Sequence, residues 1–219
     1  EKKVMDRLTT VAMYLPQFHR LPENDAWWGK GFTEWTHVGQ AKPLFPGHYQ
    51  PRIPADLGYY DLRLPEIREA QAQMARDNGI EGFIYYHYWF GLGKRMLQRP
   101  FEDVLFSGKP DFPFCLAWAN HDWTTKTWQR GKGKMASQTM IAKQEYPGDT
   151  DYIAHFQYLL PAFKDKRYIT VDGKPLFYVR YRKNTHTTWY AFYEELEEVY
   201  SIVYLANNQQ IGHLLNLNL

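Results

Sequence analysis

FPFCLAWANHDW, residues 112–123, begins as a run suited to a buried strand and ends in a crowd of hydrogen-bonding and aromatic groups. Residues Phe112 to Ala119 would be apolar on both faces of a strand, which is typical of a sheet covered on both sides. Asn120, His121 and Asp122 follow directly. Because the carboxyl ends of parallel strands meet at one edge, where ligands bind, we expect this stretch to contribute to a functional site.

Similar apolar runs elsewhere predict further strands at residues 9–15, 80–88, 175–181 and 201–205. Amphipathic segments between the runs predict helices over residues 65–78, 150–163 and 188–199. Strands that alternate with helices are typical of parallel βαβ units. We therefore expect one α/β domain over residues 1–219.

Two α/β architectures fit this pattern, an open doubly wound sheet and a closed (β/α)8 barrel. The loop after the first run, PQFHRLPENDAWWGKGFTEW, lacks the GxGxxG turn that an open nucleotide-binding sheet would usually show. A barrel accommodates long loops at its carboxyl-terminal face, so we favour a TIM-barrel-like fold. The sequence supplies about five βα units and a weakly patterned tail, which predicts an incomplete barrel.

Composition excludes several classes of protein. The 26 basic and 24 acidic residues are interspersed and give a net charge of +2, so there is no electrostatic footprint for nucleic acid or an anionic membrane. The single cysteine, Cys115, excludes an internal disulfide and is expected to be a buried, inert thiol. No apolar run approaches the roughly 20 residues of a membrane span. We expect a cytoplasmic protein that uses no cofactor.

Aromatic residues make up 17% of the chain, and many stand beside His, Asn, Asp or Gln. Flat rings with polar neighbours suit a ligand that has an apolar face and a rim of hydroxyls, as a sugar ring does. The alternative is that a small core uses Tyr and Trp as filler. Polar and aromatic side chains gather near the ends of the predicted strands, and we expect them to bind substrate: Gln17, His19, Trp28, Trp35, Tyr88, Trp89, Trp118, Asn120 and Trp123.

Five blocks of sequence are distinctive: YLPQFHRLPENDAWWGKGFTEW, KPLFPGHYQPRIPADLGYYDLRLPE, GFIYYHYWF, FPFCLAWANHDW and DKRYITVDGKPLF. Together these blocks resemble the WbsX-like glycosyltransferase family of bacterial polysaccharide biosynthesis, which is related to the family 99 glycoside hydrolases. They run from about Met13 to about Tyr181, and the match fades past Arg182, which suggests a truncated or altered C-terminus. The resemblance implies a (β/α)8 barrel, an oligosaccharide or sugar-nucleotide substrate, and a role in making O-antigen or capsule. Association with a membrane-bound glycan assembly system would fit that role.

The sequence departs from the family at one point. Many relatives have Asn-Glu-Asn-Trp where this chain has Asn120 to Trp123, so His121 occupies the glutamate position. The paired glutamates of the hydrolases have no counterpart after this strand, and their mechanism is not transferred.

Glycosyl transfer and glycoside hydrolysis both need a general acid or base near the anomeric carbon, and usually a second carboxylate. Glu34 is the first candidate, because its setting in GFTEW could raise its pKa by partial desolvation. Asp122 could act as the second group, could orient His87 or His121, or could cap a turn. Glu23 and Asp25 in the first loop are further carboxylates. We expect the catalytic residues to be Glu34, Asp122, His121 and His87.

Metal and phosphate sites are weakly indicated. His19, His87 and His121 each lie at the end of a different predicted strand, but no HxH or HExxH spacing supports a metal site. The DTD triplet at residues 149–151 is better explained by helix capping than as a DxD motif. The basic loop at residues 130–134 is the remaining candidate for phosphate.

Three functions therefore stay open. The first is glycosyl transfer in surface polysaccharide biosynthesis. The second is endo-acting glycoside hydrolysis of the same glycans. The third is carbohydrate binding without catalysis, since an incomplete barrel would lack the residues that later strands supply.

Overall fold

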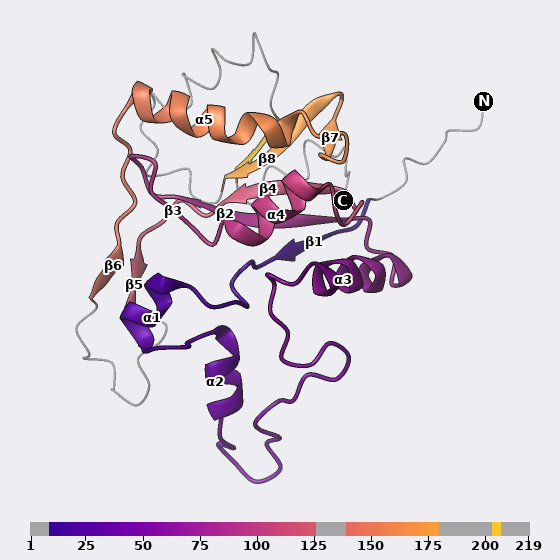
Figure 1. The fold of residues 1–219 in the computed structure, drawn as a ribbon, viewed down its shortest axis with the longest axis vertical. Helices are drawn as coiled ribbons and strands as arrows, with labels where there is room; N and C mark the ends of the chain where they lie inside the picture. The colour runs from indigo at the N-terminus through magenta and orange to yellow at the C-terminus, as the bar shows by residue number, and fades with distance from the viewer. Residues whose placement is uncertain (1–8, 126–138, 180–202, 207–219) are drawn as a thin grey trace. The chain divides into compact units, whose positions relative to one another are not determined.

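A computed structural model describes residues 9–125 and 139–179, together with the backbone of residues 203–206 (Figure 1). The chain forms two compact units. The first unit contains Glu1–Tyr85 and Arg99–Cys115, and the second contains Tyr86–Gln98 and Leu116–Leu219. Each unit is described by itself below.

The parallel strands follow one another in the sheet in the order in which they occur in the chain. They are β1 (Val11–Tyr14), β2 (Gly82–Trp89), β4 (Phe114–Trp118), β8 (Lys174–Val179) and β9 (Val203–Ala206). Pairing is parallel between β1 and β2, between β4 and β8, and between β8 and β9. All five predicted strands are thereby confirmed. A doubly wound sheet reverses its strand order at a switch point, whereas a (β/α)8 barrel adds each strand beside the last, so the observed order is of the barrel type.

Helices occupy the connections between these strands. α3 (Pro65–Asp77) precedes β2, α4 (Arg99–Ser107) precedes β4, and α5 (Asp149–Phe163) precedes β8. α3 and α5 lie within one residue of their predicted bounds, and Pro65 opens α3 as expected. The helix predicted over residues 188–199 lies outside the described residues. None of the described helices is long and apolar enough to cross a membrane.

The long connection after β1 contains two short helices, α1 (Pro22–Trp28) and α2 (Glu34–Gln40). Short antiparallel strands extend the sheet: β3 (Arg95–Met96) pairs with β2, and β7 (Thr170–Val171) pairs with β8. A separate two-stranded ribbon consists of β5 (Trp123–Thr124) and β6 (Met140–Ala142).

The core of the first unit is aromatic. The Phe83 ring lies 5.0 Å from the Tyr14 ring and 4.8 Å from the Phe112 ring, between centroids. Tyr85 on the same strand face packs near Phe101 of α4, at 5.7 Å. These contacts place the odd-numbered residues of β2 on the helix-covered face of the strand.

The core of the second unit forms where α5 packs on β8. Phe177 lies 5.9 Å from Phe163, and Leu159 and Phe177 are completely buried. Cys115, at the end of the first unit, is also fully buried, and burial raises the pKa of its thiol to about 12. The predicted buried thiol is therefore confirmed.

Candidate active site

The connection after β1 is held in a fixed shape by its own polar groups. The Arg20 guanidinium donates to the Asp25 carboxylate, with 2.8 Å between Nε and Oδ2, and the Gly31 amide donates to Oδ1 at 2.7 Å. The hydrogen bond from Arg20 holds the pKa of Asp25 below its usual range. Asp25 therefore remains ionised at neutral pH and fastens the loop.

Glu34 is the first residue of α2, where the Thr33 amide donates to the Thr36 hydroxyl in a capping box. The Glu34 side chain is half-buried, and its Oε1 is buried with no hydrogen-bond partner among the described residues. Burial raises the pKa of this carboxyl group to about 7, so the predicted rise is confirmed. A carboxyl group with this pKa exists in both protonation states near neutral pH and can give or take a proton.

An aromatic frame stands beside Glu34. The Trp35 ring lies 4.7 Å from Phe18 and 5.0 Å from Tyr60, and its Nε1 donates to the Tyr60 carbonyl at 2.8 Å. Trp28, also half-buried, packs 6.0 Å from Phe32. Trp35 is thus fixed in orientation by the hydrogen bond from its ring nitrogen and by the rings around it.

His19 is buried in the same connection, at 1% exposure, and neither ring nitrogen has a hydrogen-bond partner in the described part of the chain. Burial lowers the pKa of His19 to about 4 despite the opposing charge of Asp61, so the imidazole is neutral. Asn24 is equally buried, and its Nδ2 has no described partner. Gln17, another predicted binding residue, is buried and accepts the His19 amide at its carbonyl.

His19, Asn24 and Glu34 all lie in the connection after β1, and each has a buried polar atom with no partner among the described residues. Buried polar atoms are rarely left unsatisfied, because each costs about 1–3 kcal/mol, so each of the three is a candidate to bind a ligand. The connection follows the carboxyl end of β1, which is where barrel enzymes bind their substrates. The sequence could not predict that Asn24 Nδ2 and the two ring nitrogens of His19 would lack hydrogen-bond partners among the described residues, because this depends on burial.

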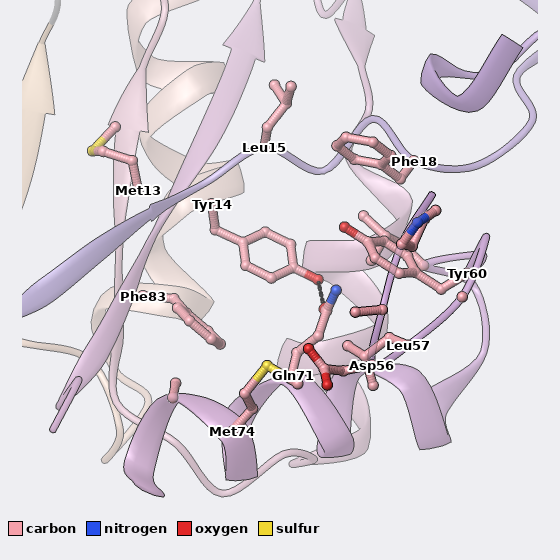
Figure 2. Close-up of a pocket in the computed structure, with 15 residues that line it drawn as sticks. Met13, Tyr14, Leu15, Phe18, Asp56, Leu57, Tyr60, Gln71, Met74 and Phe83 are labelled. Carbon is pink, nitrogen blue, oxygen red and sulfur yellow. Dashed lines mark hydrogen bonds between the residues drawn. The ribbon is translucent and has the colours of Figure 1, made fainter. Parts of the chain in front are cut away.

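A groove of about 560 Å³ in the first unit borders the aromatic frame (Figure 2). Phe18 and Tyr60 of the frame line it, and Asp56 adds a carboxylate. The Tyr14 ring projects toward α3 in Figure 2, and its hydroxyl donates to Gln71 Oε1 at 2.6 Å. The groove therefore offers flat apolar rings together with hydrogen-bonding groups, a combination that suits a sugar.

The second unit contains a histidine cluster, which consists of His87 and Trp89 of β2 and Asp151 and His155 of α5. The Nε2 atoms of His87 and His155 lie 2.8 Å apart. Trp89 Nε1 donates to Asp151 Oδ2 at 3.0 Å, and the Trp89 ring stacks on His155 with centroids 4.6 Å apart. His155 is not among the site residues expected from the sequence, and Asp151 was expected only to cap the helix. Their i,i+4 spacing is a signal only when the facing strand residues are known.

Both histidines of this cluster are neutral. Burial, with the Arg95 charge as a smaller cause, lowers the pKa of His87 to about 3. Burial also puts the pKa of His155 well below its ordinary value, with His87 as the smaller cause.

Two of the predicted sugar platforms are packed inside the second unit. Trp118 is 1% exposed, and its Nε1 donates to the Trp89 carbonyl at 3.0 Å. Trp89 is 4% exposed, and its ring packs on His155 and near Tyr158 of α5. Rings so enclosed offer no open face to a ligand, so this placement favours the core-packing alternative for both.

Tyr88 lies between His87 and Trp89 and so projects to the opposite face of β2. There the Trp123 ring packs edge-on against Tyr88, with centroids 5.0 Å apart, and against Phe90 at 5.6 Å. Trp123 is half-buried. Of the aromatic residues predicted in the second unit, Trp123 therefore keeps the exposure that sugar stacking needs.

The polar residues after β4 fasten neighbouring loops. Asn120 Nδ2 donates to the Tyr146 hydroxyl at 3.1 Å, and that hydroxyl donates to the Asn120 carbonyl at 3.2 Å. Asp122 is exposed, and its Oδ1 accepts the Gln144 amide at 2.7 Å. His121 is half-buried. Of the four predicted catalytic residues, Glu34 belongs to the first unit, whereas Asp122, His121 and His87 belong to the second. The structure therefore describes the surroundings of Glu34 separately from those of the other three.

Within residues 9–125 and 139–179, no group of three or more His, Cys, Asp or Glu side chains is arranged to hold a metal ion. The basic loop at residues 130–134 lies outside the described residues.

Comparisons with known proteins agree with the sequence blocks. A model of the family Glycosyltransferase WbsX matches residues 10–212. Two strains of Xanthomonas campestris pv. campestris, B100 and ATCC 33913, each have a protein named uncharacterized protein WxcX that is 44% identical over 171 residues. The match covers 78% of this chain but 24% of WxcX, so the chain spans about a quarter of the length of these curated relatives.

Among solved structures, the chain is similar to a GH99 endo-alpha-mannosidase from Bacteroides thetaiotaomicron, with 17% identity and a TM-score of 0.43. That match covers 78% of this chain and 44% of the mannosidase. The same enzyme in complex with BIS-TRIS-propane gives 15% identity, a TM-score of 0.43, and coverage of 78% and 41%. Because the family model spans nearly the whole chain, the protein belongs to the WbsX glycosyltransferase family.

Proposed function

We propose that the protein is a carbohydrate-active enzyme of bacterial surface polysaccharide biosynthesis and that it transfers a glycosyl group from a sugar nucleotide. Membership of the WbsX glycosyltransferase family supports the reaction class. The observation that carries the proposal is Glu34, a half-buried carboxyl group with a pKa of about 7 and no described partner for its buried Oε1. It follows β1 and directly precedes Trp35, whose ring packs on Phe18 and Tyr60, two of the residues that line the groove.

In the proposed reaction, the Glu34 carboxylate accepts the proton of an acceptor hydroxyl. The hydroxyl oxygen then forms a bond to the anomeric carbon of the donor, and the bond from that carbon to the nucleotide phosphate breaks with both electrons on the phosphate. A base is most effective when its pKa lies near the working pH. Desolvation of Glu34 supplies that match.

Glycoside hydrolysis is the second candidate, and the same observation favours it. The general acid of a glycosidase is a carboxyl group whose pKa burial has raised. Protonated Glu34 would then donate its proton to the oxygen of the leaving sugar, while water supplies the new bond at the anomeric carbon. The two functions predict opposite pH profiles, because transfer uses the carboxylate and hydrolysis uses the acid.

The test is turnover of the full-length protein with UDP-glucose, UDP-galactose, GDP-mannose and dTDP-rhamnose as donors, and with bacterial polysaccharide fragments as acceptors or hydrolysis substrates. For transfer, we expect the rate to rise with pH through about 7 and Glu34→Gln to lower kcat by about 100-fold or more. The control is Glu66→Gln, an exposed carboxylate on α3 that should leave the rate unchanged.

A rate that falls as pH rises through about 7, with oligosaccharide cleavage, would identify the hydrolase instead. A near-normal rate in Glu34→Gln would remove Glu34 from the mechanism. Because sugar-nucleotide donors are cytoplasmic metabolites, we propose that the reaction takes place there, at the surface of a membrane-bound assembly system. Cell fractionation tests this, since a protein recovered outside the cytoplasm would contradict it.

A further inference from the structure

Two side chains of α5 contact two side chains of β2 in register. Asp151 and His155 are four residues apart and so share one face of the helix. His87 and Trp89 are two residues apart and so share one face of the strand. His155 lies against His87 through the pair of Nε2 atoms, and Asp151 accepts the indole N–H of Trp89. The four groups therefore hold the carboxyl end of β2 to α5.

One proton must lie between the two Nε2 atoms, because a separation of 2.8 Å between them requires a donor and an acceptor. If His87 were the donor, His155 would keep a proton on Nδ1, which is buried with no described partner. If His155 is the donor, its Nδ1 is instead an unpaired acceptor, and buried unpaired acceptors are better tolerated than buried unpaired N–H groups. We infer that His155 donates and that His87 is the Nδ1–H tautomer.

Trp89 is restrained at its ring nitrogen, on its face and at its backbone. Asp151 accepts its indole N–H, the His155 ring stacks on it at an interplanar angle of 13°, and its carbonyl accepts Trp118 Nε1. Asp151 and His155 are 7% and 1% exposed, so neither is placed to touch a substrate directly. Their effect must pass through the strand that they hold.

The residue between His87 and Trp89 is Tyr88, and it faces the other way. Its ring meets Trp123, whose ring plane is inclined at 79° to it. We propose that Asp151 and His155 are positioning residues for the half-buried Trp123 ring, which acts as a stacking platform for a sugar. They act on Trp123 through Tyr88, whose own ring is 6% exposed and supports Trp123 from below the platform. The sugar-binding part of this proposal rests on the proposed function, whereas the positioning part does not.

The first experiment reads the histidine tautomers by long-range ¹⁵N–¹H correlation on ¹⁵N-histidine protein at pH 7, with His87→Gln used to assign signals. We expect the Nδ1–H form of His87 and the Nε2–H form of His155. The Nε2–H form of His87, or an imidazolium at either residue, would overturn the hydrogen-bond direction.

The second experiment reads the platform through the ¹⁹F signal of Trp123 in fluorotryptophan protein, assigned with Trp123→Phe. His155→Leu removes the donor, and we expect the Trp123 signal to shift or broaden. His155→Gln keeps an N–H donor near the Nε2 position and should restore it. Gln157→Leu, at an exposed position on α5, is the control. An unchanged Trp123 signal in folded His155→Leu would refute the positioning role.

Asp151 is tested in the same way at the indole proton of Trp89. Asp151→Asn keeps an oxygen acceptor and should preserve the shift of that proton, whereas Asp151→Leu should lose it. With the donor that supports turnover, His155→Leu should raise KM by about 10-fold with a smaller change in kcat. An unchanged KM would refute the platform. If the wild-type protein neither transfers nor cleaves sugars, the proposed function fails, while the ¹⁵N and ¹⁹F results still decide the positioning role.

Discussion

At the scale of single residues, the turn after β2 requires a glycine at position 91, because of both its backbone conformation and its close neighbour. Gly91 has φ of +94°, and a Cβ at this position would lie 2.8 Å from the Glu145 carbonyl oxygen. The Glu145 amide donates to the Phe90 carbonyl at 3.0 Å, so the two segments cannot separate without losing that bond. Gly93 has φ of +73°, but a Cβ there meets nothing within 4 Å in the described structure.

Comparing the two glycines separates the cost of a left-handed backbone, which an alanine would have at both positions, from the cost of a steric clash, which it would have only at position 91. Gly93→Ala should cost about 1–2 kcal/mol of unfolding free energy, from the left-handed backbone alone. Gly91→Ala should cost a further 1–3 kcal/mol or so, from the forced displacement of the loop around Glu145. Urea unfolding of the two variants measures the difference. Equal losses would show that the Glu145 segment moves aside freely.

The sequence allowed some of these residue-scale features to be predicted. Burial raises the pKa of Glu34, and partial desolvation of this carboxyl group was expected from its position between Thr33 and Trp35. The contact between His87 and His155 joins residues 68 positions apart, and no local pattern encodes it. Trp89 and Trp118 were expected to be sugar platforms, but both are buried in the structure. Aromatic composition does not reveal which rings have both faces covered.

At the scale of elements, long apolar runs and helices with clear stripes were predictable, and short elements were not. The five parallel strands and both α3 and α5 match their apolar patterns. α1 and α2 have seven residues each and are separated by Gly29 and Gly31, so no stripe could develop. α4 contains Pro100 near its start, which reads as a break unless the proline is recognised as part of the first turn.

The stripe of α5 supplies a matched stability test. Leu159 is completely buried, while Ile153 on the same helix is 44% exposed. Leu159→Ala should lower the free energy of unfolding by about 2–5 kcal/mol, because it removes buried methyl groups and leaves a cavity. Ile153→Ala should stay within about 0.5 kcal/mol of the wild type, as surface substitutions usually do. Chemical denaturation compares the two, and similar losses would mean that α5 is not packed as described.

At the scale of the whole molecule, buried neutral histidines make stability depend on pH. Folding lowers the pKa of His19 to about 4 and of His87 to about 3, and that of His155 also falls. Below pH 6.5 or so these three histidines bind protons in the unfolded chain but not in the folded chain. Glu34, with its pKa raised to about 7, binds a proton only in the folded chain over part of this interval, but it is one group against three. The charged groups near these histidines are Asp61, Arg63, Arg99 and Asp103 for His19, and Arg95 for His87.

We expect the Tm to be nearly constant above pH 7 and to fall steadily as pH drops from about 6.5 toward 4, before the carboxylates have titrated fully. Thermal melts across pH 8 to 4 measure this dependence. His155→Gln removes one of the titrating groups, so its Tm should fall less steeply over the same interval. A wild-type Tm that is unchanged between pH 7 and pH 5 would contradict neutral burial of these residues.

The agreement between strand order in the sheet and strand order in the chain has a consequence for biosynthesis. Each parallel strand leaves the ribosome after the strand that it will pair with, so the growing sheet always has its next docking edge already exposed. Pairing can then proceed one strand at a time as the chain is synthesised. The ribosome therefore synthesises the parallel strands in the same order in which they pair in the sheet.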